Sequence, residues 1–279
     1  MPYLLCPTTP PGASWLAMAQ TPRNISMNQT IDPQIAANVT QHIIKAMTES
    51  LCASTPMLSW HGPRTGGGMV SAGGSAFLIR TQTDILGVTA RHVVDGFIAA
   101  RTMCRGLAAT LGGFSFDLEE CLIGRGSKAD IATFRIRDAD LPAIGFRPLE
   151  RAWPPATPAS NGIVLLAGWP GHERVVGTER VTGGIYIGWG SAGVSELQIT
   201  IRADHDCGLF SPLPAVPLPP PGFDFGGISG GPVMVIDAED NGCRIGWRLA
   251  GVVSEGKPDY DYIVATRADI IQNDGKISG

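Results

Sequence analysis

Apolar and polar residues alternate along several short segments of this chain, as they do in β-strands that bury one face. The alternation is clearest at 196–202, where polar residues separate Leu197, Ile199 and Ile201. A second alternating segment covers 130–136. Further short apolar segments predict strands at 75–80, 84–89, 163–167, 185–189, 233–236, 247–254 and 262–266. The pattern therefore predicts a mainly β fold.

One segment near the start of the chain has a helical period instead. Asp32 and Pro33 suit the N-cap and the first position of a helix. Apolar side chains then recur every four residues, at Ile35, Val39, Ile43 and Met47. This helix either packs on the β domain or forms a regulatory segment that docks a partner. Residues 1–31 have no clear period and are expected to be irregular, and 268–273 predicts a short closing helix.

Prolines mark two boundaries in the strand pattern. The cluster at 154–158 interrupts the strands and predicts a linker. We therefore expect an N-terminal extension with one helix at 1–58, a β domain at 59–153 and a second β domain at 154–279. The segment 212–221 holds six prolines and is either a stiff loop beside a substrate cleft or a ligand for an SH3-like module.

Composition supports the β architecture and argues against some partners. The 279 residues include 36 glycines, 22 prolines and 16% charged residues, which suits many short elements joined by tight turns. A net charge of -4 provides no basic field, so we expect neither nucleic acid nor a membrane as a partner. No signal segment or membrane-length apolar run occurs, which predicts a cytoplasmic location. The six cysteines include no C-x-x-C pair, which predicts reduced thiols.

The segment 226–232 places one serine, Ser229, among four glycines and a proline, directly before a short apolar run. A serine becomes a nucleophile only when a base accepts its proton and backbone donors stabilise the oxyanion. Glycines permit the sharp turn that this arrangement requires. The plain alternative is a tight turn that leads into a buried strand.

Two other residues favour the catalytic interpretation. His92 stands at the end of one predicted strand and Asp130 at the start of another. The order His92, Asp130, Ser229 is that of a chymotrypsin-type catalytic triad. The G-x-S-x-G elbow of α/β hydrolases also fits 227–231, but that fold needs a histidine after the serine, and the last histidine is His205.

Three motifs occur in the same order along the chain: T-A-x-H at 89–92, D-[IL]-A at 130–132 and G-x-S-G-G-P at 227–232. Together they resemble the trypsin-like (chymotrypsin-fold) serine peptidases, especially the bacterial branch with the HtrA-type enzymes. The turn at 168–171 and the strand at 251–254 resemble further motifs of that family. The resemblance implies an all-β fold of two six-stranded antiparallel β-barrels, preceded by the helical extension and closed by the short C-terminal helix.

The resemblance also implies a serine endopeptidase that hydrolyses peptide bonds through an acyl-enzyme intermediate. Ser229 would be the nucleophile, His92 the general base, and Asp130 the residue that orients the imidazole. The backbone N–H groups of Gly227 and Ser229 would form the oxyanion hole. No metal or cofactor is needed, and the substrate would be a protein or peptide. The alternative is a catalytically silent or latent trypsin-fold protein that serves as a binding or scaffold module.

Substrate-binding residues follow from the same resemblance. Phe223, six residues before the serine, would lie at the base of the primary pocket and favour small or aliphatic side chains. Asp224, Glu255 or Asp261 in that pocket would instead favour Lys or Arg. The strand that pairs with the substrate backbone would contribute Val253, Ser254 and Gly256.

Overall fold

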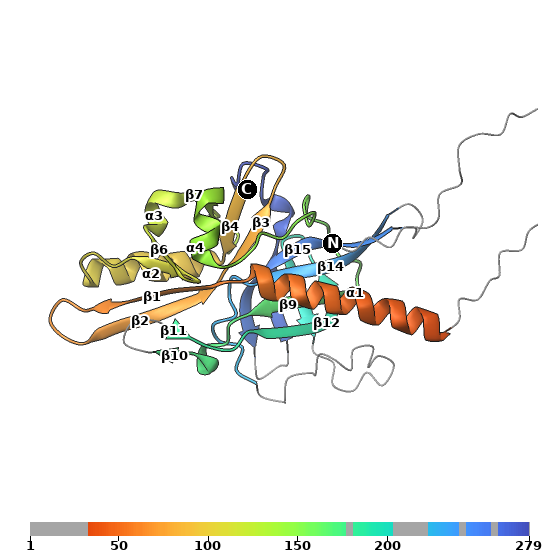
Figure 1. Ribbon diagram of the computed structural model, residues 1–279, viewed down its shortest axis with the longest axis horizontal. Helices are drawn as coiled ribbons and strands as arrows, with labels where there is room; N and C mark the ends of the chain where they lie inside the picture. Colours follow the sequence, from red (N-terminus) through yellow and green to blue (C-terminus); the bar gives the residue numbers. More distant parts are fainter. Residues whose placement is uncertain (1–32, 177–180, 203–222, 240–243, 258–261, 279) are drawn as a thin grey trace, which may run out of the picture.

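The computed structural model describes residues 33–176, 181–202, 223–239, 244–257 and 262–278 (Figure 1). Two four-stranded antiparallel sheets make up the first half of this part. One has the order β2-β1-β5-β6, with β1 (Met57–Pro63), β2 (Met69–Ser75), β5 (Ala109–Leu111) and β6 (Phe114–Phe116). The other has the order β3-β4-β8-β7, with β3 (Phe77–Arg80), β4 (Ile85–Thr89), β7 (Leu122–Arg125) and β8 (Ala132–Ile136).

The second half is a closed antiparallel barrel of six strands in the order β12-β13-β16-β15-β14-β9. Its strands are β9 (Ile163–Gly168), β12 (Tyr186–Val194), β13 (Gln198–Arg202), β14 (Pro232–Glu239), β15 (Arg244–Lys257) and β16 (Tyr262–Arg267). A separate two-stranded antiparallel sheet consists of β10 (Val175–Val176) and β11 (Val181–Thr182). The predicted strands of this half are therefore present, with longer bounds at several ends.

Helices cover the sheets at a few places. They are α1 (Pro33–Ser54), α2 (Arg91–Met103), α3 (Leu118–Cys121) and α4 (Leu141–Ile144), with 3-10 turns at Asp138–Asp140, Gly171–Glu173 and Ala268–Ile270. Among the described residues, no helix is both long enough and apolar enough to cross a membrane. The thiols of Cys52, Cys104 and Cys121 are free.

The structure differs from the sequence-based expectations in three respects. Among the described residues, one barrel is closed. The strands of the first half form two hydrogen-bonded sheets, and only Ala76 separates β2 of one sheet from β3 of the other. A second closed barrel therefore remains a prediction. The expected helix at 268–273 is only a 3-10 turn, because Ile271 pairs with Ile277 instead of continuing the helix. His92, expected at the end of a strand, lies in the first turn of α2.

The second half of α1 packs into a core that both halves of the molecule share. Met47 and Leu51 are 1% exposed and lie in a cluster with Phe77 from β3 and with Met234 and Leu249 from the barrel. Figure 1 shows α1 lying along the β strands. The packed alternative therefore describes this part of the helix. The segments 1–31 and 212–221 lie outside the described residues.

We expect Leu51→Ala to lower the free energy of unfolding by about 2–5 kcal/mol, because it leaves a cavity in this shared core. Urea denaturation measures the change. Lys45→Ala on the same helix serves as the control. The Lys45 side chain is 76% exposed, so its removal should change stability by less than about 0.5 kcal/mol. If Leu51→Ala changed stability as little as the control, Leu51 would contribute no packing to this core.

Candidate active site

His92 and Asp130 meet where the start of α2 faces the loop before β8. The Nδ1–H of the His92 ring donates to Asp130 Oδ2 at 2.7 Å, and the His92 backbone N–H donates to Oδ1 at 2.9 Å. Ala90, at the N-cap position of α2, has no side chain that could cap the helix. Asp130 therefore caps α2 from another segment and orients the ring, with Nε2 as the proton-accepting nitrogen of the neutral tautomer.

The Asp130–His92 contact shifts the pKa of both groups. Hydrogen bonding to Asp130 raises the pKa of His92 above its ordinary value of 6.5, against an opposing effect of burial. For Asp130, burial acts to raise the pKa, but the hydrogen bonds from the His92 ring and backbone outweigh it, and the pKa falls below 3.8. Both shifts stabilise the imidazolium–carboxylate form of the pair, which forms when the imidazole accepts a proton.

We expect the His92 ring to titrate above pH 6.5, and Asp130→Asn to bring its midpoint back toward that value. The contribution of His92 to stability is present below its unfolded pKa and is lost as the pH rises through the higher folded pKa. The contribution of Asp130 is present above its unfolded pKa and is lost as the pH falls through its lower folded pKa. NMR titration of the ring nitrogens measures the midpoint, and an identical midpoint in both proteins would contradict the assigned cause.

The serine loop, residues 226–231, lies against the same end of α2. A Cβ on Gly230 would lie 3.0 Å from the backbone nitrogen of Ala90, two residues before His92. Gly230 and Gly227 have positive φ angles of 90° and 95°, which glycine adopts without strain. The glycines that surround Ser229 therefore bring it to the His92 side of the molecule.

The Ser229 hydroxyl itself points to another group. Its Oγ donates to the Ser254 carbonyl at 3.0 Å, and no hydrogen bond joins it to His92 among the described residues. Rotation about χ1 moves Oγ between staggered positions, and nucleophile–base hydrogen bonds are often loose before substrate binds. The structure therefore brings His92 and Asp130 into direct contact, whereas the Ser229 hydroxyl is bonded to the Ser254 carbonyl.

Two carbonyl groups of the serine loop accept backbone hydrogen bonds. The Gly226 carbonyl accepts from the Gly171 N–H at 2.5 Å, and the Ile228 carbonyl from the Gly231 N–H at 3.0 Å. In a planar trans peptide the following N–H points the opposite way. No described residue accepts a hydrogen bond from the Gly227 or Ser229 N–H. Both predicted oxyanion donors are therefore available.

A half-buried arginine, Arg174, supports this loop. Nη2 of Arg174 donates to the Gly227 carbonyl at 2.8 Å and to the Trp169 carbonyl at 2.7 Å. Burial lowers the pKa of Arg174. Arg174 joins the turn at 168–171 to the serine loop, a role that its position in the sequence does not indicate.

Aromatic side chains surround the predicted base of the primary pocket. Phe223 packs edge-on against Phe225 with ring centroids 5.0 Å apart, and it lies 5.3 Å from Tyr186 and 4.9 Å from His172. The Asp224 carboxylate is exposed and accepts from the Gly226 N–H at 2.7 Å. This bond directs the carboxylate toward its own turn. Asp261 lies outside the described residues.

The remaining predicted substrate residues lie on β15. Val253 is buried, and its N–H and carbonyl are bonded to Gly231 and Gly230, so its backbone supports the serine loop and has no free N–H for a substrate. The Ser254 carbonyl accepts from Ser229, while its hydroxyl pairs with Thr266 at 2.7 Å. A Cβ at Gly256 would collide with Phe225, so only glycine fits there.

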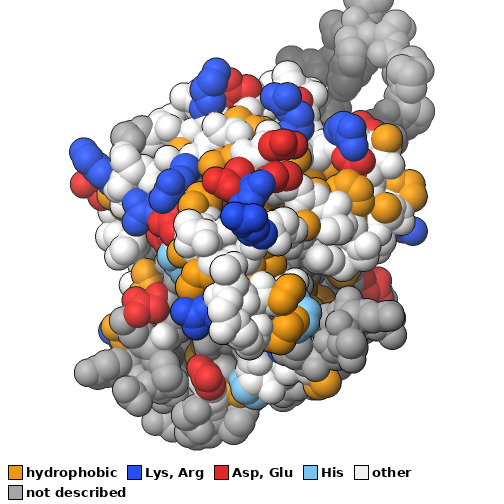
Figure 2. Space-filling model, turned by 90° about the vertical axis from the view of Figure 1, so that its left-hand side faces the viewer, with side chains coloured by type: hydrophobic (Ala, Val, Ile, Leu, Met, Phe, Trp, Pro, Cys, Tyr) orange, Lys and Arg blue, Asp and Glu red, His pale blue; other side chains and the backbone are white. Residues whose placement is uncertain are grey.

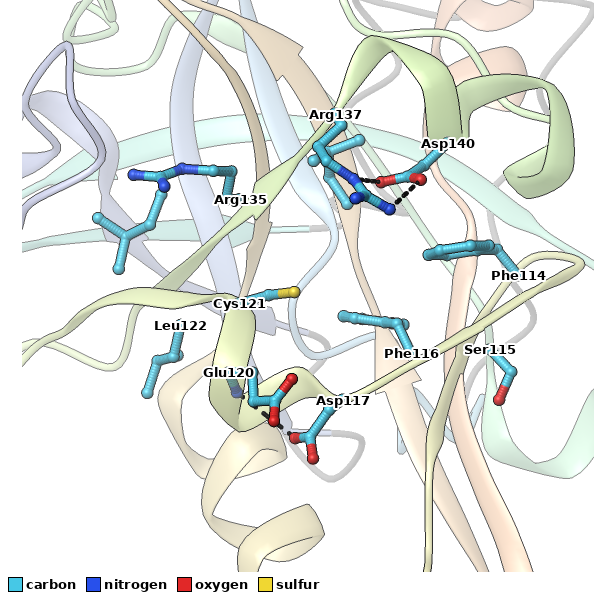
Figure 3. Close-up of a pocket in the computed structure, with 12 residues that line it drawn as sticks. Phe114, Ser115, Phe116, Asp117, Glu120, Cys121, Leu122, Arg135, Arg137 and Asp140 are labelled. Carbon is cyan, nitrogen blue, oxygen red and sulfur yellow. Dashed lines mark hydrogen bonds and ion pairs between the residues drawn. The ribbon is translucent and has the colours of Figure 1, made fainter.

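A pocket of about 480 Å³ lies at the other end of β8, between β6, α3 and β7 (Figure 3). Its walls include Phe114 and Phe116, and Figure 3 shows the Cys121 thiol pointing toward the Phe116 ring. Burial raises the pKa of Cys121, which disfavours the thiolate. Arg137 is bonded twice to Asp140 at 2.8 Å. None of the triad candidates lines this pocket.

Charged side chains of both signs are intermixed on the end of the molecule seen in Figure 2. In the first half of the chain, Arg101 forms ion pairs with Asp117 and Glu119 at 2.7 Å each. Among the described residues, no cluster of three or more His, Cys, Asp or Glu could hold a metal ion.

No protein-family model matches the chain, and no curated protein is similar to it. Among solved structures, the chain is similar to the active form of the Rv3671c protease from M. tuberculosis, with 19% identity, a TM-score of 0.47, and coverage of 92% of this chain and 90% of that one. An inactive serine-to-alanine mutant of the same protease has 18% identity and a TM-score of 0.42, with 85% and 89% covered. The thermostable serine protease AL20 from an extremophilic microorganism has 14% identity and a TM-score of 0.44, with 79% and 92% covered.

Proposed function

We propose that this protein is a trypsin-like serine endopeptidase of the HtrA-like type, built on two β-barrel domains at 59–153 and 154–279. The observation that carries the proposal is the Asp130 carboxylate, which accepts from both the ring and the backbone of His92. Such a carboxylate orients a base for a nearby nucleophile. The motifs around Ser229 and the available N–H groups of the serine loop support the same reaction.

In the proposed reaction, Ser229 Oγ attacks the scissile carbonyl carbon while His92 Nε2 accepts the hydroxyl proton. The N–H groups of Gly227 and Ser229 stabilise the oxyanion, at about 3 kcal/mol per donor. The C–N bond then breaks, and His92 gives its proton to the leaving amine. Water, deprotonated by His92, hydrolyses the acyl-enzyme and restores the serine.

The aromatic group around Phe223 supports a preference for small or aliphatic side chains before the cleaved bond. Tyr186 and Phe225 pack against Phe223, so this group is aromatic. The Asp224 carboxylate, one candidate partner for Lys or Arg, accepts a hydrogen bond from the Gly226 N–H instead. In this proposal, Ser254 and Gly256 on β15 border the cleft, whereas the buried Val253 supports the serine loop.

Incubation of the purified chain with a mixed peptide library, followed by mass spectrometry, tests this proposal. Cleavage after small or aliphatic residues is expected, and Ser229→Ala and His92→Ala should each abolish it. Cleavage that persists in Ser229→Ala would overturn the proposal. A folded wild type that cleaves nothing would favour the silent binding protein.

A further inference from the structure

Ser75, the last residue of β2, is fully buried and uses every polar group that it has. Its N–H donates to the Ser229 carbonyl at 2.8 Å, and its carbonyl accepts from the Thr89 hydroxyl at 2.7 Å. Its hydroxyl donates to the Gly227 carbonyl at 3.1 Å and accepts from the Trp169 N–H at 2.8 Å. One hydroxyl can do both, because it has one hydrogen and two lone pairs.

Together with the bonds of Arg174, these contacts form a closed ring of hydrogen bonds that supports the serine loop. Ser75 links Trp169 to Gly227 through its hydroxyl, and Arg174 links the same two residues through its guanidinium. Trp169 is held in turn by a 2.8 Å bond from its indole N–H to the Thr55 carbonyl. The ring therefore joins the first sheet, the 168–171 turn and the serine loop.

The ring holds the two peptide groups on either side of Gly227. Ser75 fixes the Gly227 carbonyl directly, and the Ile228 N–H of the same peptide donates to Phe225 at 3.2 Å. By anchoring Trp169, Ser75 also steadies the turn whose Gly171 N–H holds the Gly226 carbonyl. The orientation of the Gly227 N–H follows from that bond, because the peptide is planar.

We propose that Ser75 is a positioning residue that holds the serine loop in the conformation in which the Gly227 N–H can stabilise the oxyanion. This role in catalysis rests on the proposed peptidase function. Space around the loop favours it as well, because a Cβ on Gly230 would collide with the Ser75 carbonyl and the Thr89 hydroxyl. The serine loop therefore packs directly against Ser75. Loss of the Ser75 hydroxyl removes its hydrogen bonds with the Gly227 carbonyl and the Trp169 N–H.

The test compares Ser75→Ala and the nearly isosteric Ser75→Cys with Ser59→Ala. Ser59 is a buried serine on the neighbouring strand β1, with no hydrogen bond to the serine loop among the described residues. We expect kcat to fall about ten- to a hundredfold in both Ser75 variants, since a directly acting oxyanion donor is worth more. KM should stay within about twofold, because ground-state contacts are unchanged. Affinity for a peptide trifluoromethyl ketone, whose adduct places an oxyanion in the hole, should fall in parallel with kcat/KM.

Amide hydrogen exchange of Trp169 gives a readout that needs no activity, and it should accelerate in both Ser75 variants but not in Ser59→Ala. Folded Ser75 variants with wild-type kcat and wild-type ketone affinity would overturn the proposal. Slow Trp169 exchange in those variants would overturn it too. A wild type without turnover would refute the peptidase function. If exchange were still faster in the Ser75 variants, only the catalytic part of the Ser75 role would fall with it, and its support of the serine loop would stand.

Discussion

Asp130→Asn is expected to lower kcat by about 10⁴-fold while the protein stays folded. The amide oxygen can still accept from the His92 backbone N–H, so the cap of α2 is kept. The amide NH₂ facing Nδ1 favours the other tautomer of His92, in which Nε2 carries the proton. The imidazole then cannot accept the proton of Ser229. Steady-state hydrolysis of a peptide substrate measures the loss.

Asp138→Asn is the matched control for that variant, because Asp138 is a 77% exposed carboxylate of the same half. It should leave kcat/KM unchanged. Asp130→Asn activity within tenfold of the wild type would contradict the role assigned to the His92–Asp130 contact.

Arg174→Met is expected to lower kcat by about 10²-fold, because both carbonyls that it bridges lose a charged donor. The Gly227 carbonyl keeps only the Ser75 hydroxyl, and the Trp169 carbonyl loses its guanidinium donor. KM should change little if Arg174 acts on the serine loop alone. Combined with Ser75→Ala, the two effects should not add, since both residues hold the same carbonyl.

Arg105→Met, which removes an exposed arginine, is the control for Arg174→Met and should have wild-type kinetics. Thermal unfolding should separate a local effect from a global one. A large rise in KM with unchanged kcat would mean that Arg174 binds substrate instead of supporting the loop.

Much of the β framework could be predicted because alternation is a local signal. Residues 196–202 alternate clearly and form β13, and the apolar segment at 163–167 forms β9. The His92–Asp130 contact also follows from motifs with a fixed order. Helix α2 was not predicted from the sequence, although Val93, Val94, Phe97 and Ala100 recur with a helical period.

The supports of the serine loop could not be predicted in the same way. Arg174 is an ordinary charged residue in the sequence, and its burial depends on contacts with Trp169 and Gly227, 53 residues away. Ser75 reaches Gly227 across 152 positions. The position of Ser75 just before a strongly apolar strand was a weak signal of a buried polar group. The closed barrel likewise depends on long-range pairing, which local patterns do not encode.

Labelling by a fluorophosphonate probe tests most directly whether Ser229 is an activated nucleophile. The probe phosphonylates a serine hydroxyl with loss of fluoride when a base accepts the serine proton. We predict rapid labelling of the wild type, none of Ser229→Ala, and labelling slowed by several orders of magnitude in His92→Ala. A well-folded wild type that remains unlabelled, or equal labelling of Ser229→Ala, would contradict the assignment of Ser229, His92 and Asp130 as a catalytic triad.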